Sequence, residues 1–336
     1  MGLKKNLRAL NDQQYWDDVE KNVRKRGGIH PVIGVSGGFD STLLVYCIKK
    51  YTSLEPILVH VDAGWNSAIA SRNLSCLVRY TGYRFETVIP DWDTLRNAYR
   101  GVLLSNLIQV DYIQDSVFFS RLYEFCECNK LPVVLTGANT MTEWVREPIE
   151  YGSFPGVDPR GLSKIIGFDL VNKLRLRNVL DYKILMRVKR DLSVFRPIFK
   201  TEFKIDCWAR ELKKEFGFVN PERKHFESRL TRWLEGYWLP VQFGINRSRM
   251  HVSSLIISGQ IDRTGGEALY KRYLEEIPDI GKDTIYVLDK MEIDQQELEN
   301  LKLKSYLSIL DVGIQSKALH FLGHALSFLG NGRKYS

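Results

Sequence analysis

The sequence predicts an α/β protein in which a parallel sheet with helical crossovers precedes a mostly α-helical C-terminal region. Three observations predict this class. Short apolar, β-branched segments alternate with longer segments of helical spacing from Pro31 to Thr136. A turn with two glycines follows the first apolar segment, and only helical patterns remain after about Thr201. Strands that alternate with helices of this length favour parallel pairing with right-handed crossovers.

The predicted elements follow one another in the order that such a sheet requires. A charged helix, whose last part is Trp16–Arg26, ends at Gly27 and Gly28. Strands are predicted at four apolar segments, Pro31–Val35, Pro56–Val61, Phe85–Ile89 and Pro132–Thr136. Helices are predicted between them, over Ser41–Lys50, Asn66–Tyr80 and Val110–Asn129.

Three regions are predicted along the chain. Residues 1–28 form an N-terminal helical extension, residues 29–200 form the α/β domain, and residues 201–330 form a mostly helical region for substrate or partner binding. A long loop is expected at Glu147–Leu162, which is rich in proline and glycine, and long loops inside compact enzymes are often lids or binding loops.

The positive charge of the chain is concentrated in one segment. The net charge is +8, yet the segment Pro159–Lys214 alone carries fifteen Lys and Arg against six Asp and Glu. Such an excess favours a polyanionic ligand, for example nucleic acid or the phosphates of a nucleotide. A solvated basic face, or a basic rim around a nucleotide site, explains the same excess.

No segment is expected to cross or target a membrane. Met1–Arg26 is polar and charged and has no apolar core of a signal peptide. The apolar stretch Ile314–Leu329 is interrupted by Lys317, His320 and His324, so it is predicted to be a packed helix. A cytoplasmic location and the absence of a membrane partner are expected.

The five cysteines indicate a reducing compartment, because their number is odd and they have no framework spacing. Cys126 and Cys128 lie in a predicted helix, where a spacing of two points the side chains to different faces. They are therefore interpreted as small hydrophobic residues rather than as zinc ligands.

The sharpest chemical feature is the loop Ser36-Gly37-Gly38-Phe39-Asp40-Ser41-Thr42, which joins a predicted strand to a helix. The two glycines let the backbone turn tightly and approach a ligand closely. The amides that follow and the helix N-terminus form an anion cradle, to which Ser36, Ser41 and Thr42 add hydroxyl groups. The loop is not a Walker A loop, because no lysine follows the glycines.

The pattern S-G-G-x-D-S after the first strand resembles the loop of the N-type ATP pyrophosphatases, the PP-loop superfamily. The resemblance implies a Rossmann-like, adenine nucleotide alpha hydrolase-like domain that uses ATP and Mg²⁺. Enzymes of this group cleave ATP between the α and β phosphates, hold the leaving pyrophosphate in the loop, and transfer AMP to a substrate oxygen. Asp40 is expected to contact Mg²⁺ or to orient the cradle; the alternative is a charge that only favours the helix dipole.

Further ATP-binding residues are expected where other strands end, because open parallel sheets bind ligands beyond the carboxyl ends of their strands. His60 and Asp62 follow the second predicted strand, and Gly137 and Asn139 follow the fourth. Arg196 precedes a proline, which resembles an arginine-proline pair of several PP-loop enzymes and suggests a phosphate contact. A surface arginine before a loop proline explains the pair equally well.

Additional segments resemble the N-acetyl sugar amidotransferases of bacterial lipopolysaccharide and flagellin-sugar pathways. The resemblance spans most of the chain from Val32 to about Ala268. The segments that carry it are His60–Ser67, Gly137–Asn139 with Thr142-Glu143, Lys224–Arg232, Tyr237–Pro240, Phe243–Ile245, Ser253–Ile256 and Ser258–Gln260.

This resemblance implies an ATP-dependent amidotransferase. The acetamido oxygen of a nucleotide-activated sugar would be adenylated and then displaced by ammonia, which gives an acetamidino sugar, AMP and pyrophosphate. The implied ammonia source is a separate glutaminase subunit with a cyclase-like channel subunit. The sequence agrees, because its first cysteine, Cys47, lies in the helix after the loop and no glutaminase domain is evident.

The resemblance also suggests the residues of a sugar site. Sugar contacts are expected from Trp65, Asn66, Glu143, Arg229 and Arg232. His225 or Glu227 is expected to remove the proton that ammonia brings. At helical spacing, His225, Arg229 and Arg232 share one face, although a salt-bridged helix face is the alternative.

Two other functions remain open at this stage. A tRNA-modifying ATP pyrophosphatase of the lysidine-ligase type needs no cysteine, and the basic segment favours it. The amidotransferase prediction needs no nucleic acid, so nucleic acid is not the expected partner. The basic segment means that the sequence does not exclude it. A nucleotide-binding subunit without catalysis is the third possibility, against which the intact loop argues.

Overall fold

A five-stranded parallel sheet forms the centre of the protein in a computed structural model, which describes residues 7–145, 159–178, 181, 192–199, 201–302, 305–308 and 311. The strand order is β4-β3-β2-β5-β6. The strands are β2 (Val32–Gly34), β3 (Ile57–Val61), β4 (Phe85–Val88), β5 (Val133–Leu135) and β6 (Ser193–Phe195). The four predicted strands are confirmed, and β6 is an additional one.

The order reverses at β2, which has β3 on one side and β5 on the other. In open α/β sheets, such a reversal leaves a crevice beyond the carboxyl end of the central strands, and ligands bind there. The glycine loop follows β2 directly, so the topology places it at this crevice.

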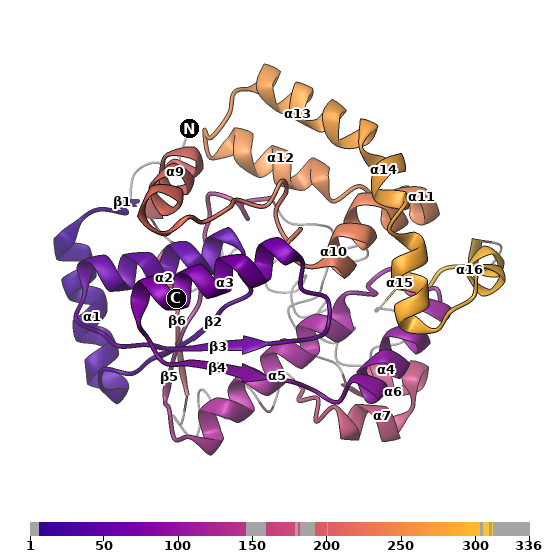
Figure 1. Ribbon diagram of the computed structural model, residues 1–336, viewed down its shortest axis with the longest axis horizontal. Coiled ribbons are helices and arrows are strands. Elements are labelled where there is room, and N and C mark those ends of the chain that lie inside the picture. The colour runs from indigo at the N-terminus through magenta and orange to yellow at the C-terminus, as the bar shows by residue number, and fades with distance from the viewer. Residues whose placement is uncertain are drawn as a thin grey trace, which may run out of the picture.

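Helices cover both faces of the sheet, because side chains alternate along each strand. Ile33 and Leu135 belong to a core that includes residues of α2 (Phe39–Tyr51) and α3 (Ala68–Thr81). Val32 and Val134 belong to a second core on the opposite face, with α5 (Tyr112–Cys128). Figure 1 shows α2 and α3 on one side of the strands and α5 on the other.

The remaining elements are mostly helical and follow the sheet in sequence. A short strand β1 (Arg8–Ala9) pairs in parallel with β7 (Thr201–Glu202). The other helices are α1 (Gln13–Gly27), α4 (Trp92–Leu104), α6 (Pro159–Ile166), α7 (Phe168–Lys173), α9 (Ile205–Phe216), α10 (Arg229–Trp233), the π-helix η3 (Leu234–Trp238), α11 (Leu239–Phe243), α12 (Ser248–Ile257), α13 (Arg263–Glu275), α14 (Ile277–Gly281), α15 (Thr284–Met291) and α16 (Gln295–Lys302).

Some boundaries differ from those that the sequence predicts. The predicted loop at Glu147–Leu162 ends earlier, because Pro159 begins α6; residues 146–158 lie outside the described residues, as does the predicted helix Ile314–Leu329. The sequence pattern also missed α4, whose N-terminus is capped by Asp91. Trp16, Leu43 and Leu212 share one core, so the three predicted regions pack against one another.

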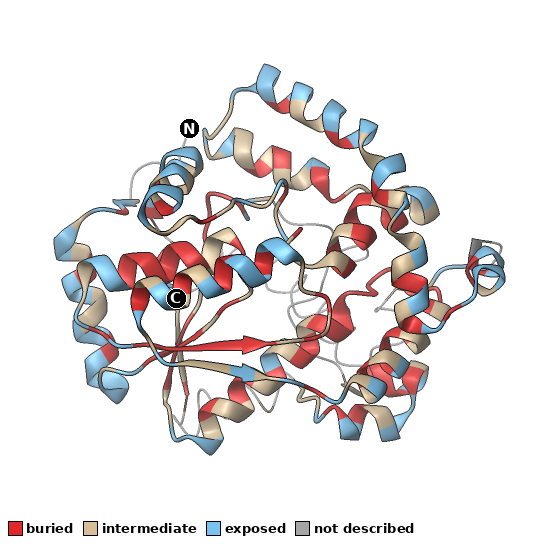
Figure 2. Cartoon of the chain, in the orientation of Figure 1, coloured by how far each residue is buried: buried red, intermediate tan, exposed pale blue. Residues whose placement is uncertain are grey.

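The C-terminal helices share one apolar core with α4, α5 and the end of β3. Trp233 and Trp238 are fully buried there and stack with ring centroids 5.3 Å apart. Figure 2 shows the buried residues along the sheet and on the facing sides of the helices around it. Among the described residues, no helix combines the length and apolar character that a membrane span requires.

Candidate active site

The glycine loop is held against α3 in a conformation that only glycine supports well. Gly37 has a φ of 81°, and a Cβ atom there would lie 2.5 Å from the Ala70 carbonyl oxygen. Gly38 is the N-cap of α2, and no side chain caps the helix. The first turn of a helix leaves backbone N–H groups without intrahelical partners, so the loop offers an anion site.

The segment after β5 packs directly onto the first turn of α2. A Cβ atom at Gly137 would lie 2.6 Å from the Asp40 carbonyl carbon and 2.8 Å from the Ser41 nitrogen. The Asp40 Oδ1, Ser41 Oγ and Thr136 Oγ1 atoms, which come from these two touching segments, are buried and have no hydrogen-bond partner. Buried polar atoms are normally paired. The carboxylate oxygen therefore suits a hydrated Mg²⁺ at this point, and the two hydroxyl groups suit phosphate oxygens.

A segment of the C-terminal region reaches the loop. The backbone of Trp65 to Ser67 pairs with the backbone around Glu227: the Ser67 N–H donates to the Glu227 carbonyl at 2.9 Å, and the Arg229 N–H donates to the Trp65 carbonyl at 2.7 Å. This pairing places the Glu227 side chain over the loop, where its Oε1 accepts a hydrogen bond from Ser36 Oγ at 3.0 Å. A Cβ atom at Gly38 would clash with the same carboxylate.

Lys224 completes the cluster, and sequence reasoning assigned it no role. Its Nζ atom lies 3.0 Å from Asp40 Oδ2 and 2.7 Å from Glu143 Oε1. It also donates to Thr142 Oγ1 at 2.7 Å. The structure therefore brings Asp40, Glu143 and Glu227 close to one another, and it adds a lysine to a loop that has none. Only the fold reveals this neighbour, because no spacing rule connects Lys224 to the loop.

The carboxylates and cations of the cluster influence one another. Surrounding protein raises the pKa of Glu227, and the nearby charge of Asp40 adds to this effect, although Ser36 and Lys224 oppose it. Desolvation by the surrounding protein lowers the pKa of Lys224, but Asp40 and Glu143 outweigh it, so its pKa is raised and the ammonium stays charged. Glu227 is thus a stronger base than an ordinary glutamate.

His225 lies beside this cluster but not on the predicted helix face, which is a correction. Helix α10 begins only at Arg229, and His225 has a φ of 65°, which is strained for a residue other than glycine. Its ring lies 5.8 Å from that of His251, measured between centroids. The surrounding protein lowers the pKa of His225, and Lys224 and Arg247 add to the shift, although His225 is exposed to solvent. Both histidines are neutral near pH 7, because the pKa of His251 is lowered as well.

His60 and Asn139 occupy the predicted strand ends, but their polar atoms are engaged within the protein. His60 Nδ1 lies 2.8 Å from the Val35 carbonyl and its Nε2 lies 2.9 Å from Asn66 Nδ2. Asn139 Oδ1 accepts hydrogen bonds from the backbone of Met141 and Thr142, each at 3.0 Å. We correct the prediction for these residues: in this structure they shape the strand ends, and they offer no free polar atom to ATP.

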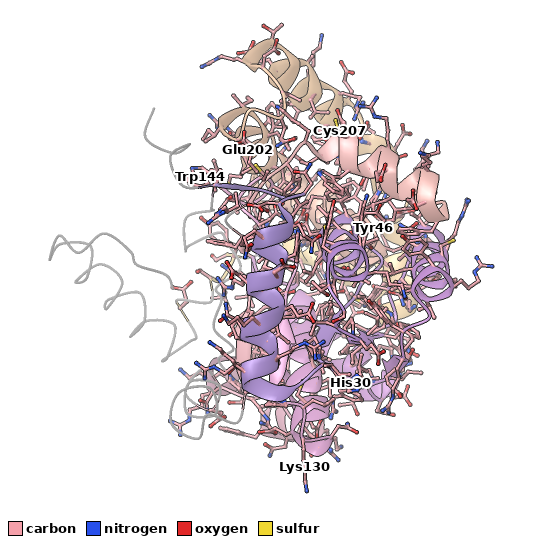
Figure 3. All side chains as sticks on the ribbon, turned by 90° about the vertical axis from the view of Figure 1, so that its left-hand side faces the viewer. His30, Tyr46, Lys130, Trp144, Glu202 and Cys207 are labelled. Atoms are coloured by element: carbon pink, nitrogen blue, oxygen red, sulfur yellow. The ribbon has the colours of Figure 1, made fainter. Side chains whose placement is uncertain are left out.

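Asp62 and Arg196 follow β3 and β6 at the same edge of the sheet. Asp62 accepts a hydrogen bond from the Gly64 N–H at 2.8 Å and so shapes its own turn. Arg196 is exposed, with its guanidinium 5.8 Å from the centre of the Phe199 ring. Figure 3 shows this edge from the side of α1: Trp144 lies at the end opposite His30 and Lys130, which precede β2 and β5. A phosphate contact from Arg196 stays a prediction.

The structure places the predicted sugar-binding residues in different surroundings. Glu143 lies in the cluster, and Asn66 is bound to His60, whereas Trp65 is 2% exposed and packs edge to face on Tyr99. Arg229 and Arg232 both pair with Asp283, and the Arg229 guanidinium stacks on Tyr286 at 3.4 Å. Trp65 is therefore a core residue, and the two arginines do form ion pairs, as the alternative expects; a sugar contact from these partly exposed arginines stays a prediction.

Replacing Trp65 by phenylalanine tests this correction. We expect the free energy of unfolding to fall by about 1–2 kcal/mol, because a smaller ring leaves a gap in the core. The KM for the substrate should stay unchanged, since the Trp65 ring has no exposed face. Urea unfolding and steady-state kinetics measure the two quantities; a large rise in KM at unchanged stability would restore the sugar-binding role.

Asp115 on α5 is a titratable group near the site that the sequence did not single out. Burial raises its pKa, and the charge of Asp111 adds to this effect, although Arg247 opposes it. Asp111 itself is bound to Arg247, which also lies 3.4 Å from Glu235. In the folded state Asp115 holds its proton to a higher pH than in the unfolded state, so this group makes the fold less stable as the pH rises from about 4 through the raised pKa.

The variant Asp115→Asn should lack the contribution that Asp115 makes to the pH dependence of stability. We expect it to be more stable than the natural chain at pH 8 and similar at pH 5, because asparagine resembles the protonated acid. Urea unfolding at the two pH values gives the comparison. Equal stability differences at both pH values would show that Asp115 is ionised throughout.

The cysteines carry no obvious chemistry. Cys47 and Cys126 are buried, Cys76 is partly buried, and Cys128 and Cys207 are exposed. The expectation that Cys126 and Cys128 lie on different faces is confirmed, although Cys128 is not a buried residue. In the part of the chain that the structure describes, no group of three or more His, Cys, Asp or Glu residues is arranged to hold a metal ion.

The strand order and the glycine loop at its reversal define a Rossmann-like α/β protein with a candidate anion site at the reversal. Residues 227–307 match the family model described as "LPS biosynthesis protein WbpG-like, C-terminal domain". The match begins at Glu227, the glutamate that lies over the loop. A search of the curated proteins finds no match.

Solved structures with a similar fold come from several kinds of protein. An NH3-dependent NAD synthetase from Campylobacter jejuni is 14% identical with a TM-score of 0.40, over 79% of this chain and 94% of that one. The U34-tRNA thiolase NcsA from Methanococcus maripaludis is 11% identical with a TM-score of 0.39, over 79% of this chain and 80% of that one. At such scores the likeness decides nothing about substrate or activity.

Proposed function

We propose that this protein is an ATP-dependent sugar amidotransferase that forms AMP. It adenylates the acetamido oxygen of a nucleotide-activated bacterial sugar, releases pyrophosphate, and lets ammonia displace AMP to give an acetamidino sugar. The observation that carries the proposal is the contact between the two parts: Glu227, the first residue of the WbpG-like domain, lies on the phosphate loop. One part supplies ATP chemistry and the other links it to surface-polysaccharide synthesis.

The loop supports the first half of the reaction. An amide oxygen is a poor leaving group, and attaching AMP to it makes a good one, so the enzyme must stabilise the departing pyrophosphate. The amides after Gly37, the uncapped N-terminus of α2 and the unpartnered Ser41 hydroxyl offer donors for its oxygens. Ser36 becomes available when it releases Glu227, whereas the Thr42 hydroxyl donates to the Gly38 carbonyl at 2.6 Å and shapes the loop. Mg²⁺, when bound, would neutralise phosphate charge, and Asp40 is the carboxylate of the loop that fits it.

Glu227 is the better candidate of the two predicted bases. When ammonia attacks the adenylated carbon, its nitrogen must lose a proton before the amidine is complete. The raised pKa of Glu227 suits a proton acceptor near neutral pH, whereas the lowered pKa of His225 makes that ring a weak base. His225 then serves to position the segment around Glu227, which its strained backbone supports.

Ammonia and its delivery belong to the same proposal. A separate glutaminase with a cyclase-like channel subunit would produce ammonia and pass it on, and the reaction would take place in the cytoplasm, where activated sugars are made. Free ammonium should replace these partners in a test tube at high concentration, since ammonia itself is the nucleophile.

Mass spectrometry of a panel of nucleotide sugars tests the proposal. The protein is incubated with each sugar, ATP, Mg²⁺ and ammonium, and the products are analysed. We expect one acetamido sugar to gain NH in place of O, with equal amounts of AMP and pyrophosphate. If no sugar changes while tRNA stimulates AMP release, the protein is a tRNA-modifying enzyme instead; if ATP binds and nothing turns over, it is a nucleotide-binding subunit.

A further inference from the structure

Lys224 and Glu227, which lie three residues apart, occupy the two halves of the candidate phosphate site. One half is the Asp40 carboxylate, and the other is the anion cradle around Gly38. Lys224 binds Asp40, the carboxylate that fits Mg²⁺, with its ammonium also on Glu143. Glu227 places its carboxylate on Ser36 Oγ and against Gly38, where the loop would bind phosphate. A cation therefore lies on the metal ligand, and an anion lies on the anion cradle.

This arrangement matches the charges of the ligand that the loop is built to hold. Magnesium pyrophosphate brings a cation to Asp40 and an anion to the amides around Gly38. The ammonium of Lys224 and a divalent cation repel each other at one carboxylate, and the carboxylate of Glu227 and a phosphate repel each other at one cradle. The surrounding protein strengthens both effects, because it excludes most of the screening water.

We propose that the segment from Lys224 to Glu227 is a built-in substitute for magnesium pyrophosphate, and that substrate binding exchanges its charges for those of the ligand. Lys224 leaves Asp40 and donates to a pyrophosphate oxygen, which makes it the phosphate-binding lysine that the loop itself lacks. Glu227 leaves the cradle and becomes available to accept a proton. This inference rests on the proposed binding of pyrophosphate by the loop.

The backbone around the segment is suited to such an exchange. His225 holds a left-handed conformation between the two charged residues, and such strained residues cluster at segments that switch. The flanking contacts are firm by comparison: Arg223 is buried and pairs with Glu276, and the Ser67 and Arg229 N–H groups anchor the other end. The side chains of Lys224 and Glu227 can then change partners while the ends of the segment stay in place.

Binding of inorganic pyrophosphate and of Mn²⁺ to the full chain tests the exchange, by calorimetry for the first and electron paramagnetic resonance for the second. We expect Glu227→Gln to bind pyrophosphate about five- to tenfold more tightly than the natural chain, because a repelling charge is removed. Lys224→Met should bind Mn²⁺ more tightly without pyrophosphate, and pyrophosphate more weakly. Glu222→Gln removes a charge from an exposed position two residues before the segment and should change neither affinity.

The outcomes separate this inference from the proposed function. If the natural chain binds pyrophosphate and Glu227→Gln binds it equally or more weakly, the exchange is wrong and the loop assignment stands. If the natural chain binds neither ATP nor pyrophosphate, the proposed function fails and takes the inference with it. Thermal unfolding of each variant shows whether it folds. If Lys224→Met does not fold, the pyrophosphate affinity of Glu227→Gln alone decides between the outcomes.

Discussion

Replacing Asp40 by asparagine is expected to lower the turnover number by about two to three orders of magnitude while the protein stays folded. The substitution keeps the size of the side chain but removes the charge that fits Mg²⁺ and pairs with Lys224. The protein should stay folded although the ion pair with Lys224 is lost, because the asparagine oxygen can still accept hydrogen bonds from Lys224 and Thr142 and Lys224 keeps Glu143 as a partner. Steady-state AMP release and thermal unfolding give the two results.

The variant Asp206→Asn is the matched control for this prediction. Asp206 also lies in the first turn of a helix, α9, where it is exposed. It should keep the natural turnover number, which separates a local effect at the loop from the general loss of a charge at a helix N-terminus. Full activity of Asp40→Asn would show that the loop works without this carboxylate and that the Mg²⁺ assignment is wrong.

Replacing Gly37 by alanine is expected to abolish pyrophosphate binding and to lower the free energy of unfolding by about 3 kcal/mol. Two effects add up: the left-handed φ of 81° disfavours alanine, and the new methyl group would lie 2.5 Å from the Ala70 carbonyl oxygen. The loop must shift away from α3, which moves its amides from the position where they converge. Urea unfolding and calorimetry with pyrophosphate measure both losses.

The variant Gly82→Ala isolates the first of these effects. Gly82 ends α3 with a φ of 65°, and nothing lies within 4 Å of the place where its Cβ atom would be. It should cost only about 1 kcal/mol and leave pyrophosphate binding unchanged. If Gly37→Ala behaves like Gly82→Ala, the loop tolerates the displacement and its packing on α3 does not matter for binding.

The sequence predicts the α/β sheet well because its strands are short, apolar and separated by clear turns. Each predicted strand from Pro31 to Thr136 appears within two residues of its expected ends. β6 was missed because Ser193–Phe195 begins with a polar residue and is only half-buried, whereas β2 and β5, which are equally short, are apolar and mostly buried. The alternation of apolar and polar residues predicts a strand only over a longer segment than Ser193–Phe195 offers.

The site was predictable only where its residues are adjacent in the sequence. The loop from Ser36 to Thr42 forms a local motif, so its shape follows from its glycines. The partners of His60, the burial of Trp65 and the approach of Lys224 depend on segments that meet only after folding. From residue type alone, His60 and Trp65 were predicted to contact a ligand, and Lys224 was given no role.

Tracing the acetamido oxygen tests the central claim most directly. An acetamido sugar that carries a heavy oxygen isotope in its acetyl group is converted with ATP, Mg²⁺ and ammonium, and the nucleotide product is examined by mass spectrometry. If the loop drives adenylation of that oxygen, the heavy isotope must appear in the phosphate of AMP, because ammonia displaces the whole AMP group. An amidine product with unlabelled AMP, or a label in inorganic phosphate beside ADP, would contradict the account.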